Sequence, residues 1–174
     1  EVIRTWNHSA NVENTEAALL IFTFNNLVDI ILSKGMQYAS NALSEEQYVD
    51  ALRKAQKHMK KHFGTLRLPL GEVQKHVRGD KEIGVGGAPD VLAAMMSKPY
   101  ENGKLKTFVG DSYIILVDFD KEGKPTIRTV NAFGASTRED SPHYNDQMEL
   151  WVEQKTKLMT LDKTEIYENA EKIY

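Results

Sequence analysis

The sequence predicts an α+β fold with helices first, a late β-hairpin and then C-terminal helices. Two stretches with helical apolar periodicity lie before residue 65, and strand-like alternation lies between residues 112 and 132. No linker, internal repeat or low-complexity tract separates them. We therefore expect residues 1–174 to form a single α+β piece.

The composition is that of an ordinary globular protein. Of the 174 residues, 41% are hydrophobic and 27% are charged, which is enough for one domain with a core. The formal net charge of -3 provides no overall basic surface for nucleic acid or an anionic membrane. The absence of cysteine excludes disulfides and thiol chemistry but fixes no compartment. Because the chain starts at Glu1 without a signal peptide, we expect a processed product or a fragment.

The most apolar run, from Ala17 to Leu32, predicts a buried helix with apolar side chains at helical spacing. Asn11 or Asn14 can cap its start, and Gly35 is placed to end it. A membrane span would need about 20 apolar residues. This run is interrupted by three polar residues, Asn25, Asn26 and Asp29.

A second helix is predicted between Ser44 and Gly64. Ser44 and Gln47 have the spacing of a capping box, and the glycine is suited to end the helix. Lysines crowd the C-terminal half, which favours a solvated face over nucleic-acid binding because no aromatic residues interleave with them. His58 and His62 have zinc-ligand spacing, but they lack the H-E-x-x-H glutamate and a nearby third ligand, so no metal site is predicted.

From Thr65 to Gly103 the sequence predicts irregular structure with short helical turns at most. The run Gly84-Val85-Gly86-Gly87 resembles a phosphate-binding loop only superficially. Pro89 occupies the third glycine position of that motif, and no Lys-Ser/Thr pair follows. We expect these glycines to allow a turn or close backbone packing.

Alternation from Ser112 to Phe119 predicts the first strand of the hairpin. Gly123 lies in the turn, and the returning strand runs from Thr126 to Ala132 after Pro125. Apolar residues occupy both faces of the first strand, so we expect it to be covered on both sides. After the hairpin, helices are predicted over residues 145–155 and from Asp162 towards Tyr174.

Three polar residues after the hairpin invite a hydrolase interpretation. Ser141, His143 and Asp146 are the residue types of a catalytic triad, but residues so close in sequence rarely converge on one point. We expect Ser141 or Asn145 to cap the following helix, and His143 and Asp146 to bond neighbouring backbone. From the residues alone, no catalytic residue and no metal ligand is assigned.

Several motifs nevertheless occur in the order found in one family. They are Val2-Ile3-Arg4-Thr5-Trp6, Gly71-Glu72-Val73-Gln74, Asp111-Ser112-Tyr113, Phe133-Gly134-Ala135-Ser136, Ser141-Pro142-His143-Tyr144-Asn145-Asp146-Gln147 and Met159-Thr160-Leu161-Asp162-Lys163. Together they resemble the C-terminal part of the large chain of the penicillin acylase family, which includes acyl-homoserine-lactone acylases. One departure is Asn7, where many members carry aspartate. The motif residues Asp111, Ser112, Tyr113, Ser141, His143, Tyr144, Asp146 and Gln147 are expected to be structural.

The resemblance implies an N-terminal-nucleophile hydrolase with a four-layer αββα core, located in the periplasm or secreted. In that family a serine freed by autocatalytic cleavage attacks the amide, and its own α-amino group acts as the base. The serine, the oxyanion donors and the calcium ligands all lie upstream of the matched region. The resemblance therefore implies no cofactor and no catalytic residue in this chain, and it makes the upstream part of the precursor a partner.

Three functions remain open. The favoured one is a scaffold segment of an acylase that cleaves amide bonds of acylated small molecules, such as penicillins or acyl-homoserine lactones. The alternatives are a non-enzymatic binding module and, less favoured, a nucleic-acid-binding domain that uses the lysine-rich helix. Without upstream strands, the hairpin would leave apolar surface exposed, so we also expect self-association of the chain.

Overall fold

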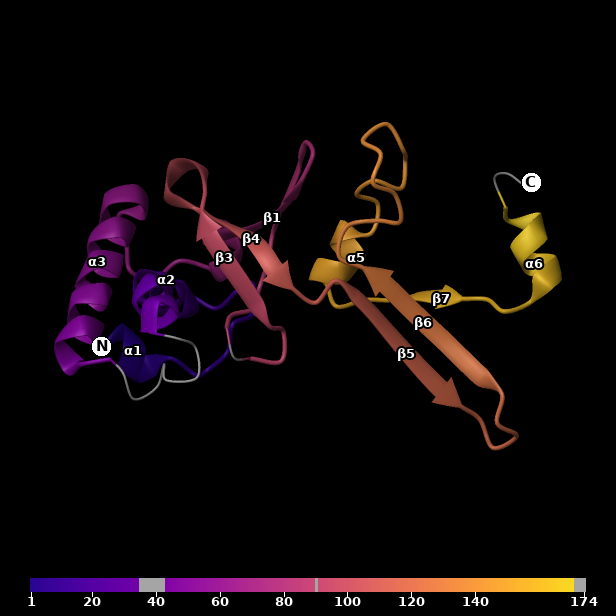
Figure 1. Cartoon of the computed structure of the whole chain (residues 1–174), viewed down its shortest axis with the longest axis horizontal. Coiled ribbons are helices and arrows are strands. Elements are labelled where there is room, and N and C mark those ends of the chain that lie inside the picture. The colour runs from indigo at the N-terminus through magenta and orange to yellow at the C-terminus, as the bar shows by residue number, and fades with distance from the viewer. Residues whose placement is uncertain (35–42, 90, 171–174) are drawn as a thin grey trace. The chain divides into compact units, whose positions relative to one another are not determined.

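The computed structural model describes residues 1–34, 43–89 and 91–170, and it divides into two compact units (Figure 1). The first unit comprises Glu1–Asp111 and the second Ser112–Tyr174. Helices combine with a four-stranded and a three-stranded sheet, so the predicted α+β class is confirmed.

The helices of the first unit are α1 (Val2–Thr5), α2 (Ala17–Lys34), α3 (Glu45–Phe63) and α4 (Leu70–Val73). Asn14 caps α2, because its Oδ1 accepts hydrogen bonds from the backbone N–H groups of residues 16 and 17. The predicted end at Gly35 lies outside the described residues. The capping box of α3 is confirmed, since the Ser44 and Gln47 side chains each bond the other's backbone N–H, and Gly64 ends the helix with a φ of 72°.

The first unit also contains a sheet in the region that the sequence analysis predicted to be irregular. Its strands are β1 (Gln74–Arg78), β2 (Lys81–Gly84), β3 (Met95–Pro99) and β4 (Leu105–Gly110), in the order β2-β1-β4-β3. The irregular prediction was wrong because these strands are short and polar, and because the central β1–β4 pair is parallel and joins residues far apart in sequence. The short 3₁₀ helix η2 (Glu101–Gly103) joins β3 to β4.

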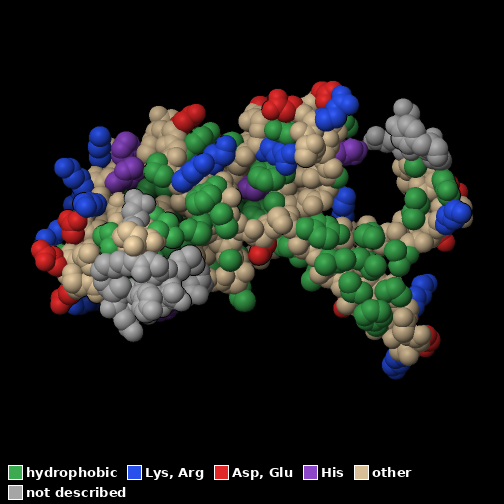
Figure 2. Space-filling model, viewed as in Figure 1, with side chains coloured by type: hydrophobic (Ala, Val, Ile, Leu, Met, Phe, Trp, Pro, Cys, Tyr) green, Lys and Arg blue, Asp and Glu red, His purple; other side chains and the backbone are tan. Residues whose placement is uncertain are grey.

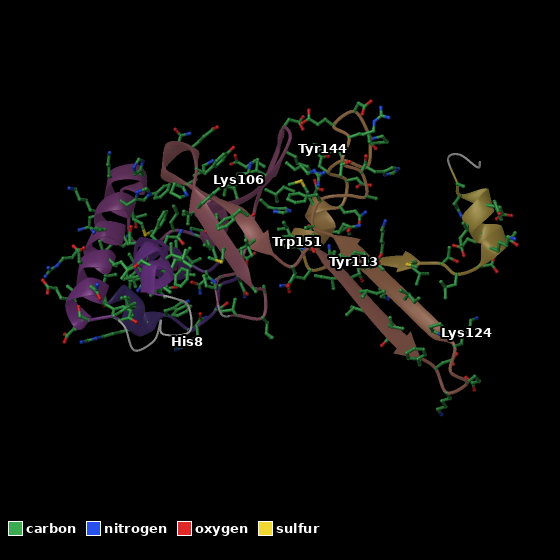
Figure 3. The ribbon with its side chains drawn as sticks, viewed as in Figure 1. His8, Lys106, Tyr113, Lys124, Tyr144 and Trp151 are labelled. Atoms are coloured by element: carbon green, nitrogen blue, oxygen red, sulfur yellow. The ribbon has the colours of Figure 1, made fainter. Side chains whose placement is uncertain are left out.

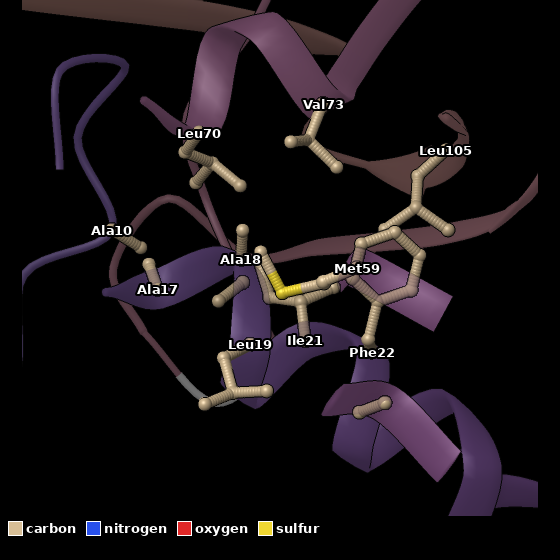
Figure 4. Close-up of a cluster of buried hydrophobic side chains, with 12 residues drawn as sticks. Ala10, Ala17, Ala18, Leu19, Ile21, Phe22, Met59, Leu70, Val73 and Leu105 are labelled. Atoms are coloured by element: carbon tan, nitrogen blue, oxygen red, sulfur yellow. The ribbon is translucent and has the colours of Figure 1, made fainter. Parts of the chain in front are cut away.

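The core of the first unit lies where α2 and α3 meet α4 and the start of β4 (Figure 4). Its largest buried side chains are Leu19, Met59, Leu70 and Leu105. Each apolar side chain of this size stabilises the fold by roughly 1.5–3 kcal/mol when it leaves water. Burial of these residues holds the two long helices to the segment between residues 70 and 105.

The irregular stretch before α2 is bonded to distant backbone. The carbonyls of Ala10, Val12, Asn14 and Thr15 accept hydrogen bonds from the N–H groups of residues 87, 71, 70 and 68, respectively. Glycines at or next to two of these positions permit the close approach, because a Cβ on Gly71 would meet the Val12 side chain and one on Gly86 would meet the Ala10 carbonyl. The predicted role of the 84–87 glycines in close packing is confirmed.

The second unit is built on β5 (Tyr113–Phe119), β6 (Pro125–Asn131) and β7 (Lys157–Met159), all antiparallel in the order β5-β6-β7. The predicted hairpin is confirmed, with Gly123 at a φ of 78° in its turn. Two short helices follow, α5 (Met148–Val152), which packs against β6, and α6 (Lys163–Glu168).

The first hairpin strand is not covered on both sides within this chain, as expected for the hairpin without upstream strands. Phe119 is 70% exposed, Leu116 is 50% exposed, and most other apolar side chains of β5 are exposed as well. Figure 2 shows hydrophobic side chains gathered along this hairpin. Apolar residues on both faces show that the strand could be buried on both sides. The second unit cannot cover it, because its other elements besides the sheet are short.

Candidate functional site

Gln147 is the centre of the motif region in the second unit. Its side chain is buried, and its Oε1 accepts a hydrogen bond of 3.0 Å from the backbone N–H of Asn131 in β6. Its own backbone N–H donates to the Phe133 carbonyl at 2.8 Å. Gln147 therefore joins the residue before α5 to the end of β6 through both side chain and backbone, while its Nε2 has no partner among the described residues.

Ser141, His143 and Asp146 lie in one loop, and the structure gives two contacts among them. His143 Nδ1 lies 2.9 Å from Asp146 Oδ2, which pairs the last two residues of the proposed triad. The Ser141 Oγ instead accepts a hydrogen bond of 3.2 Å from the backbone N–H of His143. The Ser141 hydroxyl thus stabilises a local turn.

Gly134 makes room for this turn. A Cβ at Gly134 would run into the His143 carbonyl and would also crowd the Asp146 carboxylate. The His143 carbonyl accepts a hydrogen bond from the Ser136 N–H at 3.0 Å. The loop between β6 and α5 is therefore closed on itself by backbone contacts, and Tyr144 lies within it (Figure 3).

The motif residues at the start of the hairpin lie apart from this loop in sequence and are exposed. Asp111 ends the first unit, and Ser112 begins the second. The Ser112 carbonyl accepts a hydrogen bond from the Ala132 N–H at 2.8 Å, which extends the hairpin ladder by one pair. Tyr113, labelled in Figure 3 at the start of β5, is 50% exposed.

Gln74 has a comparable role in the first unit. It is fully buried, and its Nε2 donates to the carbonyls of Val85, Gly86 and Gly87 at 3.3, 3.2 and 3.0 Å, respectively. A single amide thus holds the whole glycine-containing turn that follows β2. The sequence analysis missed this role, although a glutamine that begins a strand near a glycine run was a signal for it.

The N-terminal tryptophan segment is also a hydrogen-bonded unit. Trp6 Nε1 donates to the Ser9 carbonyl at 2.7 Å. Asn7 Oδ1 accepts from the Ser9 N–H and from Asn14 Nδ2, both at 3.0 Å. Because Asn14 caps α2, this segment is tied to the start of the helix. An asparagine at position 7 supplies the same acceptor oxygen that aspartate would supply.

The first unit contains a cavity of about 550 Å³ between α2, α3, β3, η2 and β4. The described residues that line it are mainly apolar and include Phe22, Val28, Leu32, Met96, Leu105 and Phe108. Two of its asparagines are used to hold its walls: Asn25 Nδ2 donates to the Ser97 carbonyl and Asn26 Nδ2 to the Ala51 carbonyl, each at 3.1 Å. The cavity has the size and lining that suit an apolar ligand group.

The two histidines of α3 pack beside this cavity. His58 Nε2 lies 2.8 Å from the Gly103 carbonyl, and the His58 ring lies 4.5 Å from the rings of both Phe22 and His62. The pKa of His62 is lowered mainly by loss of hydration, and the nearby His58 and Lys61 lower it further. Within the described part of the chain, no three His, Asp or Glu residues gather as metal ligands.

The family comparison agrees with the order of these motifs. A family model described as penicillin amidase matches residues 1–168. The chain belongs to the penicillin amidase family. The resemblance inferred from the sequence is therefore confirmed, and the residues described above are those of a family member.

Three curated relatives are each named acyl-homoserine lactone acylase PvdQ. The chain is 30% identical over 99 residues to the protein of Pseudomonas fluorescens strain Pf0-1, 34% over 80 residues to that of strain Pf-5, and 31% over 101 residues to that of Pseudomonas putida KT2440. These matches cover 55%, 44% and 58% of this chain, but only 13%, 10% and 13% of the relatives. The chain thus spans a small fraction of the length of these acylases.

A solved structure of penicillin G acylase from Alcaligenes faecalis is also similar. Its sequence identity to this chain is 20% and the TM-score is 0.35. The match covers 76% of this chain and 24% of that one.

Proposed function

We propose that this chain is the C-terminal scaffold segment of an acylase that hydrolyses amide bonds of acylated small molecules. The observation that carries the proposal is the match to the penicillin amidase family over residues 1–168. The relatives' shared name supports acyl-homoserine lactones as the first substrates to test, with penicillins as the second. In this reaction water splits the amide into a carboxylate and an amine.

The scaffold role is supported by what the motif side chains do. Gln74 and Gln147 are buried and bond to backbone, and the Ser141 hydroxyl accepts from backbone. Such side chains fix loops and strand ends, and they are not presented to a substrate. The proposed nucleophile, a serine with its own α-amino group as base, and any calcium ligands would be supplied by the polypeptide upstream of Glu1.

We further propose that the whole acylase is periplasmic or secreted, as the family assignment suggests. No helix among residues 1–34, 43–89 and 91–170 is long and apolar enough to cross a membrane. The apolar surface of the hairpin is the part of the second unit that an upstream sheet would cover in the complete enzyme.

The test is to produce the chain alone and together with the polypeptide encoded upstream of it, and to assay both with an acyl-homoserine lactone and with benzylpenicillin. We expect hydrolysis by the co-produced protein and none by the chain alone. Turnover by the chain alone, abolished by Ser141→Ala, would overturn the proposal and restore the local triad.

Two variants of the co-produced protein separate a scaffold role from a catalytic one. Gln147→Leu should lower the yield of assembled enzyme while leaving kcat per assembled molecule within about twofold. Ser141→Ala should leave both nearly unchanged. A stable co-produced assembly that binds acyl compounds but hydrolyses none of them would favour the alternative function, a non-enzymatic binding module.

A further inference from the structure

The turn between β3 and β4 contains the one Asn-Gly pair of the sequence, Asn102-Gly103. Asparagine is among the residues that are chemically labile in water, because its side-chain amide can be attacked by the backbone nitrogen of the next residue. A following glycine hinders this attack least, since it has no Cβ. The pair is therefore the place in the chain where an asparagine side chain is most open to intramolecular attack.

The folded turn holds the two reacting groups apart. Asn102 has a left-handed backbone with φ 55° and ψ 27°, and Gly103 follows with φ 81°. At this ψ the Gly103 nitrogen is turned away from the Asn102 Cβ. Two bonds close the turn: the Tyr100 N–H donates to the Lys104 carbonyl at 2.9 Å, and the Lys104 N–H donates to the Glu101 carbonyl at 3.0 Å. The attack thus requires the turn to open.

Helix α3 adds a further restraint through two histidines. His58 Nε2 lies 2.8 Å from the Gly103 carbonyl, and it is the donor because a carbonyl only accepts. The His62 ring packs against Gly103, where a Cβ would run into it. The His58 ring also lies 4.5 Å from Phe22 of α2, so it is held from behind. Opening of the turn must therefore break a bond to α3 as well as the bonds within the turn.

We propose that Asn102-Gly103 is a site of spontaneous covalent modification whose rate is set by the bond from His58. When the turn opens, the Gly103 nitrogen loses its proton to water and attacks Asn102 Cγ. The N–Cγ bond forms, the Cγ–Nδ2 bond breaks, and ammonia leaves. Water then opens the resulting cyclic imide at either carbonyl, which gives aspartate or isoaspartate. The proposal is independent of the acylase activity.

The two products have different effects on the turn. Aspartate leaves the backbone unchanged and accepts a left-handed conformation, so it preserves the bond between His58 and Gly103. In isoaspartate the backbone runs through Cβ and Cγ, which lengthens the turn by one carbon. The closing bonds and the position of the Gly103 carbonyl are then lost together. Isoaspartate at position 102 therefore releases the turn from α3, and the released turn cannot re-form.

The first test uses the whole unaltered chain. It is incubated at neutral pH and physiological temperature, and tandem mass spectrometry follows the replacement of each asparagine amide by a carboxyl group. We expect conversion at Asn102 before any other asparagine, and slower conversion in the folded chain than in the chain dissolved in urea. Earlier conversion elsewhere, no conversion of Asn102 in the folded chain, or equal rates in buffer and urea would overturn the proposal.

The role of His58 is tested by a pair of variants in α3. His58→Phe keeps a ring against Phe22 and removes the N–H donor. It should convert Asn102 about two- to tenfold faster, because loss of one hydrogen bond of ordinary net strength shifts an opening equilibrium by that factor. Lys57→Ala, at an exposed position of the same helix, should react at the unaltered rate. Equal rates in the two variants would remove His58 from the proposal.

The effect on the turn is tested with the products themselves. Ion exchange separates the modified chains, because each product carries one more negative charge than the unmodified chain. The isoaspartate form should unfold at a lower urea concentration than Asn102→Asp, which reproduces the aspartate product. Equal midpoints would show that the turn survives isoaspartate and would contradict the proposed release.

Discussion

The side-chain oxygen of Gln147 accepts a hydrogen bond from the backbone N–H of Asn131 across 3.0 Å. This bond joins the residue before α5 to the last residue of β6, and Gln147 is only 2% exposed. The Gln147 side chain is buried and Asn131 is partly buried, so solvent replaces the lost bond only incompletely.

Gln147→Leu should therefore destabilise the second unit by about 1 kcal/mol, the usual net contribution of a hydrogen bond. Hydrogen exchange of the Asn131 amide, followed by NMR, measures this directly and should be faster in the variant. Glu139→Gln, at an exposed loop position, is the control and should leave that rate unchanged. Equal exchange rates in all three proteins would mean that the bond contributes nothing.

A second prediction concerns the capping box of α3. Ser44→Ala removes the acceptor for the Gln47 N–H and should lower the stability of the first unit by about 1 kcal/mol. Lys57→Ala, on the exposed face of the same helix, should be nearly silent. Thermal unfolding followed by helical circular dichroism compares the two, and equal shifts would contradict the assigned cap.

Glycine at position 103 is required by both its backbone and its surroundings. Its φ is 81°, and a Cβ there would run into the His62 ring. Gly64 has a similar φ of 72° with nothing near a Cβ, so it is a matched control. Gly64→Ala should cost about 1–2 kcal/mol for the left-handed backbone. Gly103→Ala should cost about 1–3 kcal/mol more from overpacking. Similar unfolding midpoints in urea would show that the histidine moves aside freely.

A further prediction concerns Glu82 and the pH dependence of stability. Its hydrogen bond with Lys104, at 2.9 Å, is the main cause that lowers the pKa of Glu82, and Lys75 adds to it. A carboxylate with a lowered pKa adds stability above its unfolded pKa of about 4.3, and this stability is lost as the pH falls through the folded pKa. At pH 7, Glu82→Gln should cost less than about 1 kcal/mol, because the pair is partly exposed.

An NMR titration of the Glu82 carboxyl provides the measurement. Lys104→Ala should raise the pKa of Glu82 towards its ordinary value, and Lys60→Ala, at an exposed position of α3, should not change it. A pKa of Glu82 that is unaffected by Lys104→Ala would remove the assigned cause.

The elements that sequence analysis found are those with local signals. The capping box at Ser44 and the glycine at position 64 mark both ends of α3, and the turn glycine at position 123 marks the hairpin. Each signal lies within a few residues of the structure it specifies. Local hydrogen bonds and a permitted positive φ were enough to identify these elements.

The four-stranded sheet could not be found in this way. β1 and β4 pair in parallel through Gln74 with Leu105 and Lys75 with Lys106, so the residues that complete each strand lie about thirty positions away. Their side chains are a mixture of lysine, histidine, threonine and apolar residues, without clean alternation. The cavity was missed for the same reason, because its lining comes from five separate elements.

The motif residues were found by resemblance, and their geometry was not predictable from it. Ser141, His143 and Asp146 have the side chains of a triad, yet the serine hydroxyl accepts a bond from the histidine's own backbone. The three-carbonyl contact of Gln74 depends on where the turn after β2 is placed by the fold. The residue types limited which hydrogen bonds these side chains could form, and the tertiary structure determined which of those bonds are made.

The backbone bonds of the stretch before α2 have a consequence for synthesis on the ribosome. Ala10 and Val12 are synthesised before their partners, because the N–H groups that bond to them belong to Gly87 and Gly71. At about 5–20 residues per second, Ala10 waits roughly 4–15 seconds for its partner to be made. During that interval the nascent chain can form α2 and α3, while the stretch in front of them lacks the backbone groups to which it will bond. The first unit is therefore completed late, from its beginning and its middle together.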